Sequence, residues 1–324
     1  MKKIAVLIPC YNEETTIEKV VQDFKKEFCT REEIVEIYVY DNNSTDRTAE
    51  IAIHSGAILK HEQRQGKGNV VRTMFREIEA DCYLMVDGDD TYPAEEAAKL
   101  VDPILFEEVD MVIGDRLSST YFVENKRLFH NFGNRLVRGL INRLFQSDIK
   151  DIMSGYRACN SLFAKTFPVL SKGFEIETEM TIHALDKNFR ILTVPIEYRD
   201  RPEGSFSKLS TVSDGKKVLK TILSLFRDYR PMGFFTLCGT VCWGLSAFFG
   251  IPVLMEYFCT SQVPRFPTLI VVCVTILIGL LLWTCGLILN VINKKHRALF
   301  EIYLNMVDMC LKKEAMGGKK NDAC

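Results

Sequence analysis

Three carboxylates stand close together at one point of the chain. The stretch YLMVDGDDTYP, residues 83–93, ends an apolar run and then places Asp87, Asp89 and Asp90 within four positions. Like charges this close repel one another, and a cation bound between them offsets the repulsion. Mg²⁺ and Mn²⁺ prefer oxygen ligands of this kind, and Gly88 lets the backbone turn sharply between the acids. The cluster therefore predicts a site for a divalent cation.

A second interpretation of this cluster is structural. Asp89, Asp90 and Thr91 each have a side chain that can cap a helix beginning at Ala94. An Asp-x-Asp triplet is also common by chance, so the position of the cluster in the fold has to decide between a ligand site and a helix cap.

The elements around the cluster alternate between strand and helix patterns. Short apolar or β-branched runs predict strands, and apolar residues at helical spacing predict the helices between them. Such alternation indicates an α/β domain with a mostly parallel sheet covered on both faces, and these sheets bind ligands beyond the carboxyl ends of their strands. The expected strands are residues 4–8, 34–40, 57–60, 82–86 and 109–113, and the expected helices are residues 15–28, 45–54, 67–78 and 94–106.

Polar residues follow three of these strands. The segment Pro9–Glu13 follows the first strand, Asp41–Ser44 follows the second, and Asp87–Asp90 follows the fourth. In a parallel sheet these three ends lie on one edge. The acids thus collect where a single ligand would bind, and this position favours the ligand site over the helix cap.

The composition argues against several other classes of protein. The chain has 41 Lys and Arg against 42 Asp and Glu, so no basic excess points to nucleic acid. Its eleven cysteines contain no two Cys-x-x-Cys pairs, which argues against a structural zinc site. Several of them lie in apolar runs, where cysteine acts as a small hydrophobic residue. We expect reduced thiols and a cytosolic soluble part.

Two uncharged apolar stretches occupy the last third of the chain, residues 233–255 and 268–292. At about 1.5 Å per residue, the second is long enough to cross the ~30 Å hydrocarbon core of a bilayer. The link between them is short and contains two prolines. The pattern predicts a transmembrane helical hairpin; the other interpretation is a pair of buried core helices.

Basic residues flank this hairpin on both sides. Both ends of the hairpin are therefore expected in the cytoplasm, with the N-terminal domain on the cytosolic face of the cell membrane. The tail after Lys312, which ends in GGKKNDAC, is expected to be disordered. The flanking residues are Arg227 and Arg230 before the first stretch, and Lys294, Lys295, His296 and Arg297 after the second.

A set of ordered motifs in this chain resembles a known family. IPCYNEE, VYDNNSTDRT, MVDGDDTYP, VIGDR, MSGYRA and RPEGSFSKL occur in this order between residue 1 and about residue 230. Together they resemble the family 2 glycosyltransferases, in the polyprenyl-phosphate branch related to dolichyl-phosphate mannose synthase. The two apolar stretches fit bacterial members that act on undecaprenyl phosphate. The resemblance implies the GT-A fold, a nucleotide-sugar donor, a divalent metal and inversion at the anomeric carbon.

The resemblance also implies roles for the residues at the strand ends. Asp89 would be the main metal ligand through the donor diphosphate, and Asp87 would meet the ribose or the metal. For Asp90, contact with sugar hydroxyls and the helix cap both stay open. The relatives have Gln where this chain has Thr91, which leaves a third protein ligand without support. Contact with the nucleoside is implied for Pro9, Tyr11 and Glu13, with Asp41 on the base, and Gly88 belongs to the same donor site.

Cations are expected on the acceptor side, because a lipid phosphate must be held beside an anionic donor. Arginine can hold phosphate through two parallel hydrogen bonds. A surface charge or a salt bridge is the other interpretation for each of these cations. Asp151 is expected to orient the acceptor, act as a base or cap the following turn. The candidate cations are Arg116, Arg157, Arg201 and Lys208.

Two further segments carry candidate residues. Residues 65–69, QGKGN, open a helix whose start favours anions, so Lys67 is expected at the donor diphosphate; a plain glycine turn is the other interpretation. In FEIETEM, residues 174–180, Glu177 or Glu179 is expected to meet sugar or to lie in solvent. His183 in the same helix is expected to be a packed side chain.

The expected domain order follows the composition along the chain. Residues 1–212 form the catalytic domain, 213–230 a juxtamembrane amphipathic helix, 231–293 the hairpin and 294–324 a cytosolic tail. Residues 126–150 and 213–229 mix cations with apolar residues, which is typical of helices that lie on an anionic membrane surface. Packing of their apolar sides against the protein agrees with the same pattern.

Rival functions are weighed against the same residues. A processive polysaccharide synthase would carry a Gln-x-x-Arg-Trp motif, but the two tryptophans lie in the apolar stretches. A nucleotidyltransferase lacks support from the ordered motifs, and a silent nucleotide-sugar-binding scaffold is disfavoured by the intact acidic cluster. The motifs look most like those of UDP-sugar enzymes, with glucose or N-acetylglucosamine as the sugar, and GDP-mannose is the alternative donor. Self-association and a small membrane partner both stay open.

Overall fold

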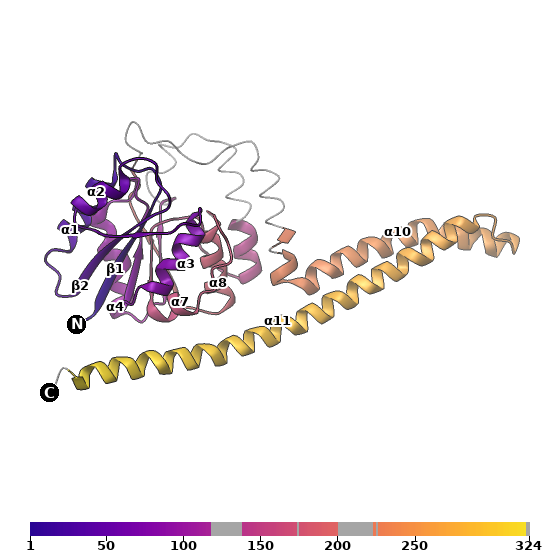
Figure 1. Ribbon diagram of the computed structural model, residues 1–324. Coiled ribbons are helices and arrows are strands. Elements are labelled where there is room, and N and C mark those ends of the chain that lie inside the picture. Colours follow the sequence, from indigo (N-terminus) through magenta and orange to yellow (C-terminus); the bar gives the residue numbers. More distant parts are fainter. Residues whose placement is uncertain (118–137, 174, 200–222, 225, 322–324) are drawn as a thin grey trace. The chain divides into compact units, whose positions relative to one another are not determined.

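The computed structural model describes residues 1–117, 138–173, 175–199, 223–224 and 226–321 (Figure 1). The chain divides into two compact units, Met1–Thr211 together with Ile302–Cys324, and Val212–Glu301. The first unit contains the sheet with its helices, and the second contains the paired apolar helices.

A seven-stranded sheet in the order β3-β2-β1-β4-β6-β5-β7 forms the centre of the first unit. Six of its strands share one direction through parallel pairs on either side of β6, which runs antiparallel to both β4 and β5. The expected mostly parallel sheet is confirmed, with β6 and β7 as strands that the sequence patterns did not reveal. The strands are β1 (Lys3–Cys10), β2 (Ile34–Asp41), β3 (Ile58–His61), β4 (Cys82–Met85), β5 (Met111–Asp115), β6 (Arg157–Asn160) and β7 (Ile191–Pro195).

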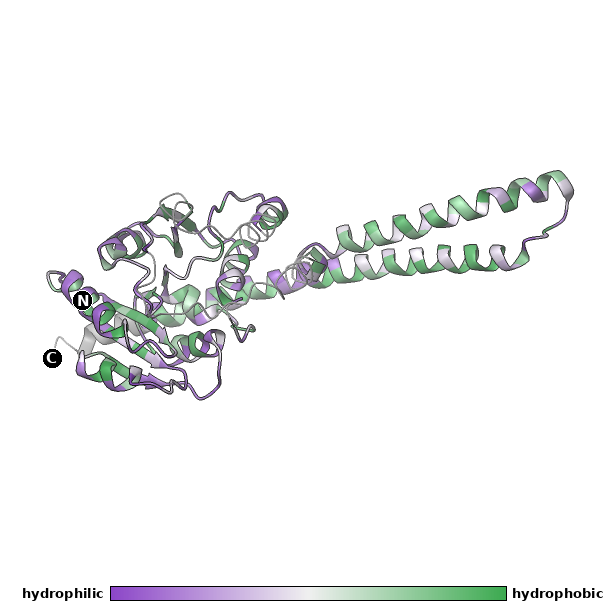
Figure 2. Cartoon of the chain, turned by 90° about the horizontal axis from the view of Figure 1, so that it is seen from above, coloured by the Kyte–Doolittle hydropathy of each residue, from purple (hydrophilic) through white to green (hydrophobic). Residues whose placement is uncertain are grey.

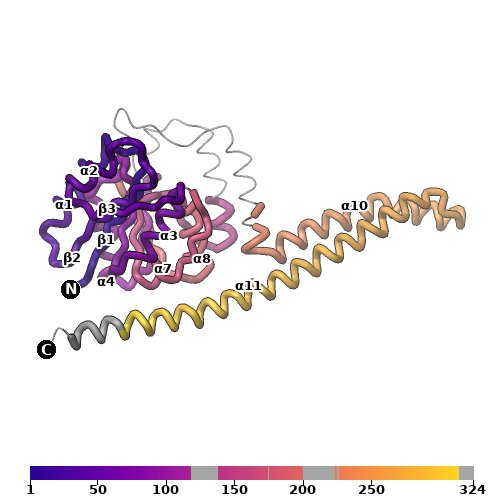
Figure 3. Tube along the Cα trace, in the orientation of Figure 1, coloured from indigo at the N-terminus to yellow at the C-terminus, as the bar shows by residue number. Residues whose placement is uncertain are grey.

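The register of the sheet brings the polar strand ends together. Cys10 at the end of β1 is opposite Asp41 at the end of β2, and Leu7 of β1 is opposite Met85 of β4. Strands β1, β2 and β3 lie side by side in the trace (Figure 3). The carboxyl ends of β1, β2 and β4 therefore share one edge, as the alternation predicts.

Helices cover both faces of the sheet. Helix α1 (Ile17–Phe28) buries Ile17, Val20, Val21, Phe24 and Phe28, the apolar side of a helical repeat, in one core with α4 (Ala97–Phe106) and with alternate strand residues such as Leu84. The other face meets α3 (Lys67–Glu77), where Phe75 contacts Tyr83 edge-on. The remaining helices are α2 (Thr48–His54), η1 (Ala94–Glu96), α7 (Ser161–Thr166) and α8 (Ile176–Asp186).

The second unit contains two helices that are long and apolar enough to cross a membrane, α10 (Pro231–Thr260) and α11 (Phe266–Asn321). Hydrophobic residues predominate where the two helices run side by side, with hydrophilic residues among them (Figure 2). Large apolar side chains point outward, with Phe248 70% and Leu281 63% exposed. The interpretation as buried core helices is therefore wrong.

Small residues let α10 and α11 pack closely. A Cβ atom added at Gly239 would lie 3.0 Å from the Gly279 carbonyl oxygen, and one added at Gly279 would lie 2.4 Å from Trp243 Nε1. Trp243 Nε1 also donates a hydrogen bond to the Ile276 carbonyl oxygen at 3.3 Å. Close approach at small residues is the usual way in which helices associate where water does not drive them together.

The expected disorder after Lys312 is wrong, because α11 continues as a helix to Asn321. The reason lies in the stretch before the tail, where Leu299, Ile302, Met306 and Met309 recur at helical spacing. A helix that is already formed extends by one hydrogen bond per residue, so it continues without a new nucleus.

The two expected amphipathic segments fall largely outside the described residues. Residues 138–145 are described and form a helix that buries Ile141 and Leu144. In this part of the chain the apolar side chains thus pack against protein.

Candidate active site

The acidic cluster lies where β4 ends. Asp89 is 4% exposed, and its Oδ1 accepts hydrogen bonds from Thr91 Oγ1 at 2.6 Å and from Thr91 N at 3.3 Å. Asp90 has a φ of 59° and forms an ion pair with Lys19 of α1. The helix-cap interpretation is wrong, because the residue that precedes η1 is Pro93 and no side-chain hydrogen bond caps that helix.

Gly88 lies where β4 approaches the end of β1. A Cβ atom at this position would lie 2.8 Å from Cys10 Sγ, closer than side chains pack. The Gly88 carbonyl oxygen accepts a hydrogen bond from Thr16 Oγ1 at 2.7 Å. Because Gly88 has no side chain, the acidic turn can pack directly against β1. This is a second role for Gly88, beside the sharp backbone turn predicted from the sequence.

The ends of β1 and β2 are joined by hydrogen bonds. Asn12 N donates to Ser44 Oγ at 2.9 Å, and Asn12 Oδ1 accepts from Thr45 N at 2.8 Å. Asp41 is 5% exposed, and its Oδ1 accepts from Ser44 N at 3.2 Å. Three of the residues expected at the nucleoside lie on this same strand-end edge: Pro9 is opposite Tyr40, Tyr11 is 36% exposed, and Glu13 N donates to Thr48 Oγ1 at 2.8 Å.

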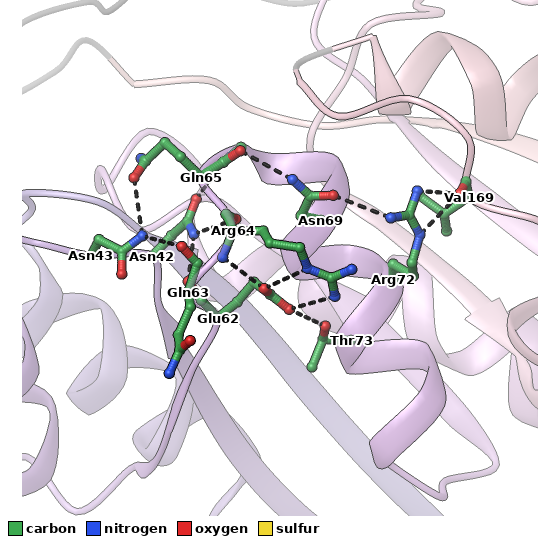
Figure 4. A network of polar contacts seen from close by, with 11 residues as sticks. Asn42, Asn43, Glu62, Gln63, Arg64, Gln65, Asn69, Arg72, Thr73 and Val169 are labelled. Carbon is green, nitrogen blue, oxygen red and sulfur yellow. Dashed lines mark hydrogen bonds and ion pairs between the residues drawn. The ribbon is translucent and has the colours of Figure 1, made fainter.

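A polar network holds the loop that leads from β3 into α3 (Figure 4). Asn42 Nδ2 donates to the carbonyl oxygens of Glu62 at 2.7 Å and Arg64 at 2.9 Å, and Asn42 Oδ1 accepts from Gly66 N at 2.7 Å. The Glu62 side chain is buried and bonds Arg64 and Thr73. The hydrogen bond from Arg64, followed by that from Thr73, outweighs burial and lowers the pKa of Glu62 to about 2.

The glycine turn that follows packs against protein. Gly66 has a φ of 124°, and a Cβ atom there would lie 2.1 Å from the Lys172 carbonyl oxygen. Gly68 N donates to that same oxygen at 3.1 Å, and a Cβ atom at Gly68 would lie 2.3 Å from the Ser171 carbonyl oxygen. These two glycines thus seat the turn on residues 171–172, and two of its amides are already bonded.

The turn places Lys67 between two carboxylates. Lys67 Nζ lies 2.5 Å from Asp87 Oδ1 and 2.6 Å from Glu177 Oε1. Burial alone would lower the pKa of this lysine, but the two carboxylates outweigh it and raise the pKa. The ammonium therefore stays charged, and it reaches the acidic cluster directly in this structure.

The other acid of α8 and its histidine have different partners. Glu179 Oε1 accepts from Leu170 N and Oε2 accepts from Ser171 N, each at 2.9 Å, so this side chain fixes the loop on which the glycine turn packs. His183 lies among the rings of Phe163, Phe167 and Phe189, with its centroid 5.2 Å from that of Phe167. The expectation of a packed histidine is confirmed.

Gly155 contributes to the site although the sequence patterns did not single it out. A Cβ atom at Gly155 would lie 2.4 Å from Asp87 Oδ2. Its amide donates a hydrogen bond to Tyr92 Oη at 2.9 Å, which ties the segment before β6 to the acidic turn. The glycine in the motif MSGYRA was the one sign of this role in the sequence. The motif itself does not predict that Asp87 is the neighbour of Gly155.

Two of the acceptor-side candidates bind each other. Arg116 donates from Nε to Asp151 Oδ2 at 2.7 Å and from Nη2 to Asp151 Oδ1 at 3.2 Å. Burial acts to lower the pKa of Arg116, but Tyr92 and Asp151 raise it well above its usual range. Asp151 Oδ1 also accepts from Met153 N at 3.2 Å, the turn cap that was one of its expected roles.

Arg157 does not lie where it was expected. It is 1% exposed at the first position of β6, an interior strand, opposite Met85 at the end of β4 and Ile113 of β5. Its guanidinium donates to the carbonyl oxygens of Ser154 and Ile152 and to Thr181 Oγ1. Burial lowers its pKa to about 10, so it stays charged at neutral pH. The prediction that Arg157 holds phosphate is corrected: its donors hold the backbone between Asp151 and β6.

Arg201 and Lys208, the remaining cations expected on the acceptor side, lie outside the described residues.

The comparisons with known proteins agree with this geometry. The sequence model described as Glycosyl transferase family 2 matches residues 5–166. The chain is 32% identical over 295 residues to glycosyltransferase AglJ of Haloferax volcanii, covering 91% of this chain and 95% of that protein. It is 28% identical over 227 residues to a dolichyl-phosphate hexose transferase of the same organism, covering 70% of this chain and 95% of that protein.

Solved structures share the fold. Glucosyl-3-phosphoglycerate synthase of Mycobacterium tuberculosis, in complex with Mn²⁺, uridine diphosphate and glucosyl-3-phosphoglycerate, aligns with a TM-score of 0.54 at 22% identity. The alignment covers 70% of this chain and 80% of that one. The fold is therefore GT-A-like, and with the matching motifs the chain belongs to glycosyl transferase family 2 and is a glycosyltransferase related to the dolichyl-phosphate hexosyltransferases.

Proposed function

We propose that this glycosyltransferase moves a hexosyl group, with inversion, from a nucleotide sugar to a polyprenyl phosphate. Undecaprenyl phosphate is the proposed acceptor and a UDP-sugar the proposed donor, with glucose or N-acetylglucosamine as the sugar. The product is a lipid-linked monosaccharide for modification of cell-envelope glycans. The observation that carries the proposal is the set of acids gathered on one sheet edge of a family 2 chain that also contains two apolar helices.

The donor set of the acidic turn fits a divalent cation. Within the described parts of the chain, no group of three or more His, Cys, Asp and Glu side chains is placed to hold a metal ion. Mg²⁺ usually takes only one or two carboxylates together with substrate phosphates, so Asp87 and Asp89 suffice once a diphosphate is bound. The proposed Mg²⁺ or Mn²⁺ would offset the charge that develops on the leaving diphosphate.

On the acceptor side, the proposal relies on cations more than on a base. The new bond joins an acceptor phosphate oxygen to the anomeric carbon while the bond from that carbon to the diphosphate breaks. A phosphate monoester is mostly ionised near neutral pH, so no strong base has to remove a proton. Arg116, held by the buried carboxylate of Asp151, is the proposed phosphate contact together with Arg201 and Lys208, and Asp151 is its positioning residue.

The membrane placement is part of the proposal. Helices α10 and α11 would form the bilayer hairpin, and the basic residues on both flanks would keep the catalytic domain and both termini in the cytoplasm. This arrangement gives the enzyme access to an acceptor that is itself a lipid.

The test uses the full-length protein in detergent. Undecaprenyl phosphate, Mn²⁺ or Mg²⁺ and a panel of UDP- and GDP-sugars are supplied, and the lipid-linked product is identified by its mass. One donor should give product, and Asp89→Ala should lower the rate at least about a hundredfold, since a metal-held diphosphate is lost. Glu175→Ala, which changes an exposed acid just before α8, is the matched control and should retain the wild-type rate.

Other outcomes of this experiment separate the alternatives. Product from GDP-mannose alone would favour the mannosyltransferase, for which a 27% identical dolichol-phosphate mannosyltransferase of Pyrococcus furiosus is a precedent. Nucleotide binding without product from any donor would favour the scaffold and contradict the proposed reaction.

A further inference from the structure

The Lys67 ammonium forms ion pairs with two carboxylates, those of Asp87 and Glu177, and these two side chains differ in solvent exposure. The Lys67 side chain is 8% exposed, and that of Glu177 is 6% exposed. The Asp87 side chain, on the opposite side of the same ammonium, is 30% exposed. The buried half of this bridge is therefore Glu177–Lys67, and the half that solvent and ligands reach is Asp87–Lys67.

A buried ammonium needs a counter-ion, because an isolated charge in a protein interior is strongly disfavoured. Glu177 alone meets that need, at 2.6 Å and with the same burial as the lysine. The contact with Asp87 is thus the one that can be given up without leaving a buried charge unpaired.

The backbone beneath Lys67 is fixed. Gly66 N is bonded to Asn42 Oδ1, and Gly68 N is bonded to the Lys172 carbonyl oxygen. The lysine therefore starts from a constant position, and only its side chain can change partners.

We propose that Lys67 is a resident counter-ion that holds Asp87 in the donor-free protein and releases it to contact the donor diphosphate, while Glu177 is the positioning residue that keeps Lys67 at the site. The proposal rests on the proposed function, because it takes a nucleotide diphosphate and a divalent cation as the ligands that arrive. Its consequence is a coupling between the two ligands: nucleotide draws the ammonium away from Asp87, and the affinity for the cation rises.

The coupling predicts opposite effects for two variants. In Glu177→Gln, the whole ammonium charge falls to Asp87, so binding of Mn²⁺ without nucleotide should weaken about threefold to tenfold. In the double variant Lys67→Met with Glu177→Gln, no ammonium competes, so Mn²⁺ should bind about tenfold more tightly than to the wild type. The double variant removes both charges of the buried pair together, which proteins usually tolerate better than loss of one partner.

The measurement is the binding of Mn²⁺ to the full-length protein in detergent, followed by the electron paramagnetic resonance signal of the free ion. It is made without nucleotide and again with saturating UDP, with Asp89→Asn as the blank for other sites. UDP should tighten Mn²⁺ binding more in the wild type than in the double variant. Glu175→Gln makes the same charge change as Glu177→Gln on an exposed residue just before α8, and it should bind Mn²⁺ like the wild type.

If only the net charge of the protein mattered, the Mn²⁺ affinities of the variants would follow a different pattern. The double variant has the same net charge as the wild type, so equal Mn²⁺ affinities for these two proteins would overturn the proposal. An affinity as weak as that of Glu177→Gln would also overturn it, because Glu177 would then act on the ion directly. The assay needs no glycosyl transfer, so the expected pattern in a protein that makes no lipid-linked sugar would sink the proposed function alone.

Discussion

The strand-end edge and the helical hairpin differ in which side chains are buried: the edge buries charged groups, and the hairpin exposes apolar ones. At the edge, charged groups such as Arg157 and Lys67 are almost inaccessible, and hydrogen bonds or ion pairs to named partners compensate for the lost water. In the hairpin, large apolar side chains such as Phe248 and Leu281 face outward, and the contacts between the helices are made by glycine and tryptophan. The first region pairs its buried charges within the protein, whereas the second exposes large apolar side chains on helices long enough to cross a membrane.

The largest effect should come from a single methyl group at the edge. Gly155→Ala places a Cβ atom where it would lie 2.4 Å from Asp87 Oδ2, so Asp87 must move away from its position. A displacement of about 1 Å at a catalytic group can cost roughly a hundredfold in rate, and we expect a loss of that order in glycosyl transfer.

The control is Gly139→Ala, whose added Cβ atom would have no neighbour within 4 Å. It should retain the wild-type rate. The effect of Gly155→Ala should be the same in detergent and in lipid vesicles, since both Gly155 and Asp87 lie in the first unit. A loss seen in only one of these media would blur the contrast between the two regions.

A smaller effect is expected at the crossing of the two apolar helices. Gly279→Ala brings a Cβ atom to 2.4 Å from Trp243 Nε1 and should lower the stability of the hairpin by about 1–3 kcal/mol, the usual cost of overpacking. The thermal midpoint of tryptophan fluorescence measures it, because both tryptophans lie in the hairpin.

Gly244→Ala serves as the reference here, since a Cβ atom at Gly244 would have no neighbour within 4 Å. Glycosyl transfer at low temperature should change little in Gly279→Ala. Alanine has the higher helix propensity, so Gly244→Ala should not lower stability, and an equal drop for both variants would contradict the close crossing as the cause.

The smallest effect is expected in the network of Figure 4 and depends on pH. The folded state lowers the pKa of Glu62 from its ordinary 4.5 to about 2, mainly through the hydrogen bond from Arg64. The stabilisation is present above pH 4.5 and is lost as the pH falls towards 2. Glu62→Gln should therefore lower stability near neutral pH by roughly 1 kcal/mol, and the difference should vanish in acid.

Denaturant titrations at several pH values, followed by far-ultraviolet circular dichroism, measure this difference. Glu108→Gln is the comparison, because the ion pair of Glu108 with Arg190 is on the surface, with the Glu108 side chain 87% exposed. A constant gap between Glu62→Gln and the wild type across the whole pH range would contradict the assigned cause.

Much of the sheet follows from local pattern. The runs that formed β1 to β5 are apolar or β-branched and are separated by helical repeats, and their parallel order brings three polar strand ends together as predicted. Strand β6 was missed because RACN has four residues and no period of its own. Its place between β4 and β5 is set by pairing with residues 44 to 78 positions away, from Ile113↔Arg157 to Cys82↔Asn160.

Residue roles were predicted less completely than strand positions. Arg157 was predicted to bind phosphate because its motif gives no sign that the side chain is buried. The burial results from the pairing of β6 with β4, which the motif does not reveal. The ion pair between Lys67 and Glu177 joins residues 110 positions apart, and neither local sequence predicts this contact. Asp87 and Asp89 could be grouped from the sequence because their spacing is local, and their role as metal ligands stays a prediction.

The hydrogen-bonded ion pair between Arg116 and Asp151 has a consequence for the residues that lie between them. It joins two residues 35 positions apart and so closes a loop of the chain at one point. The entropic cost of closing a loop rises slowly with its length, by only about 0.6 kcal/mol for each doubling. Exchange of the residues between these two positions, with Arg116 and Asp151 retained, should therefore leave the sheet and the acidic turn in place.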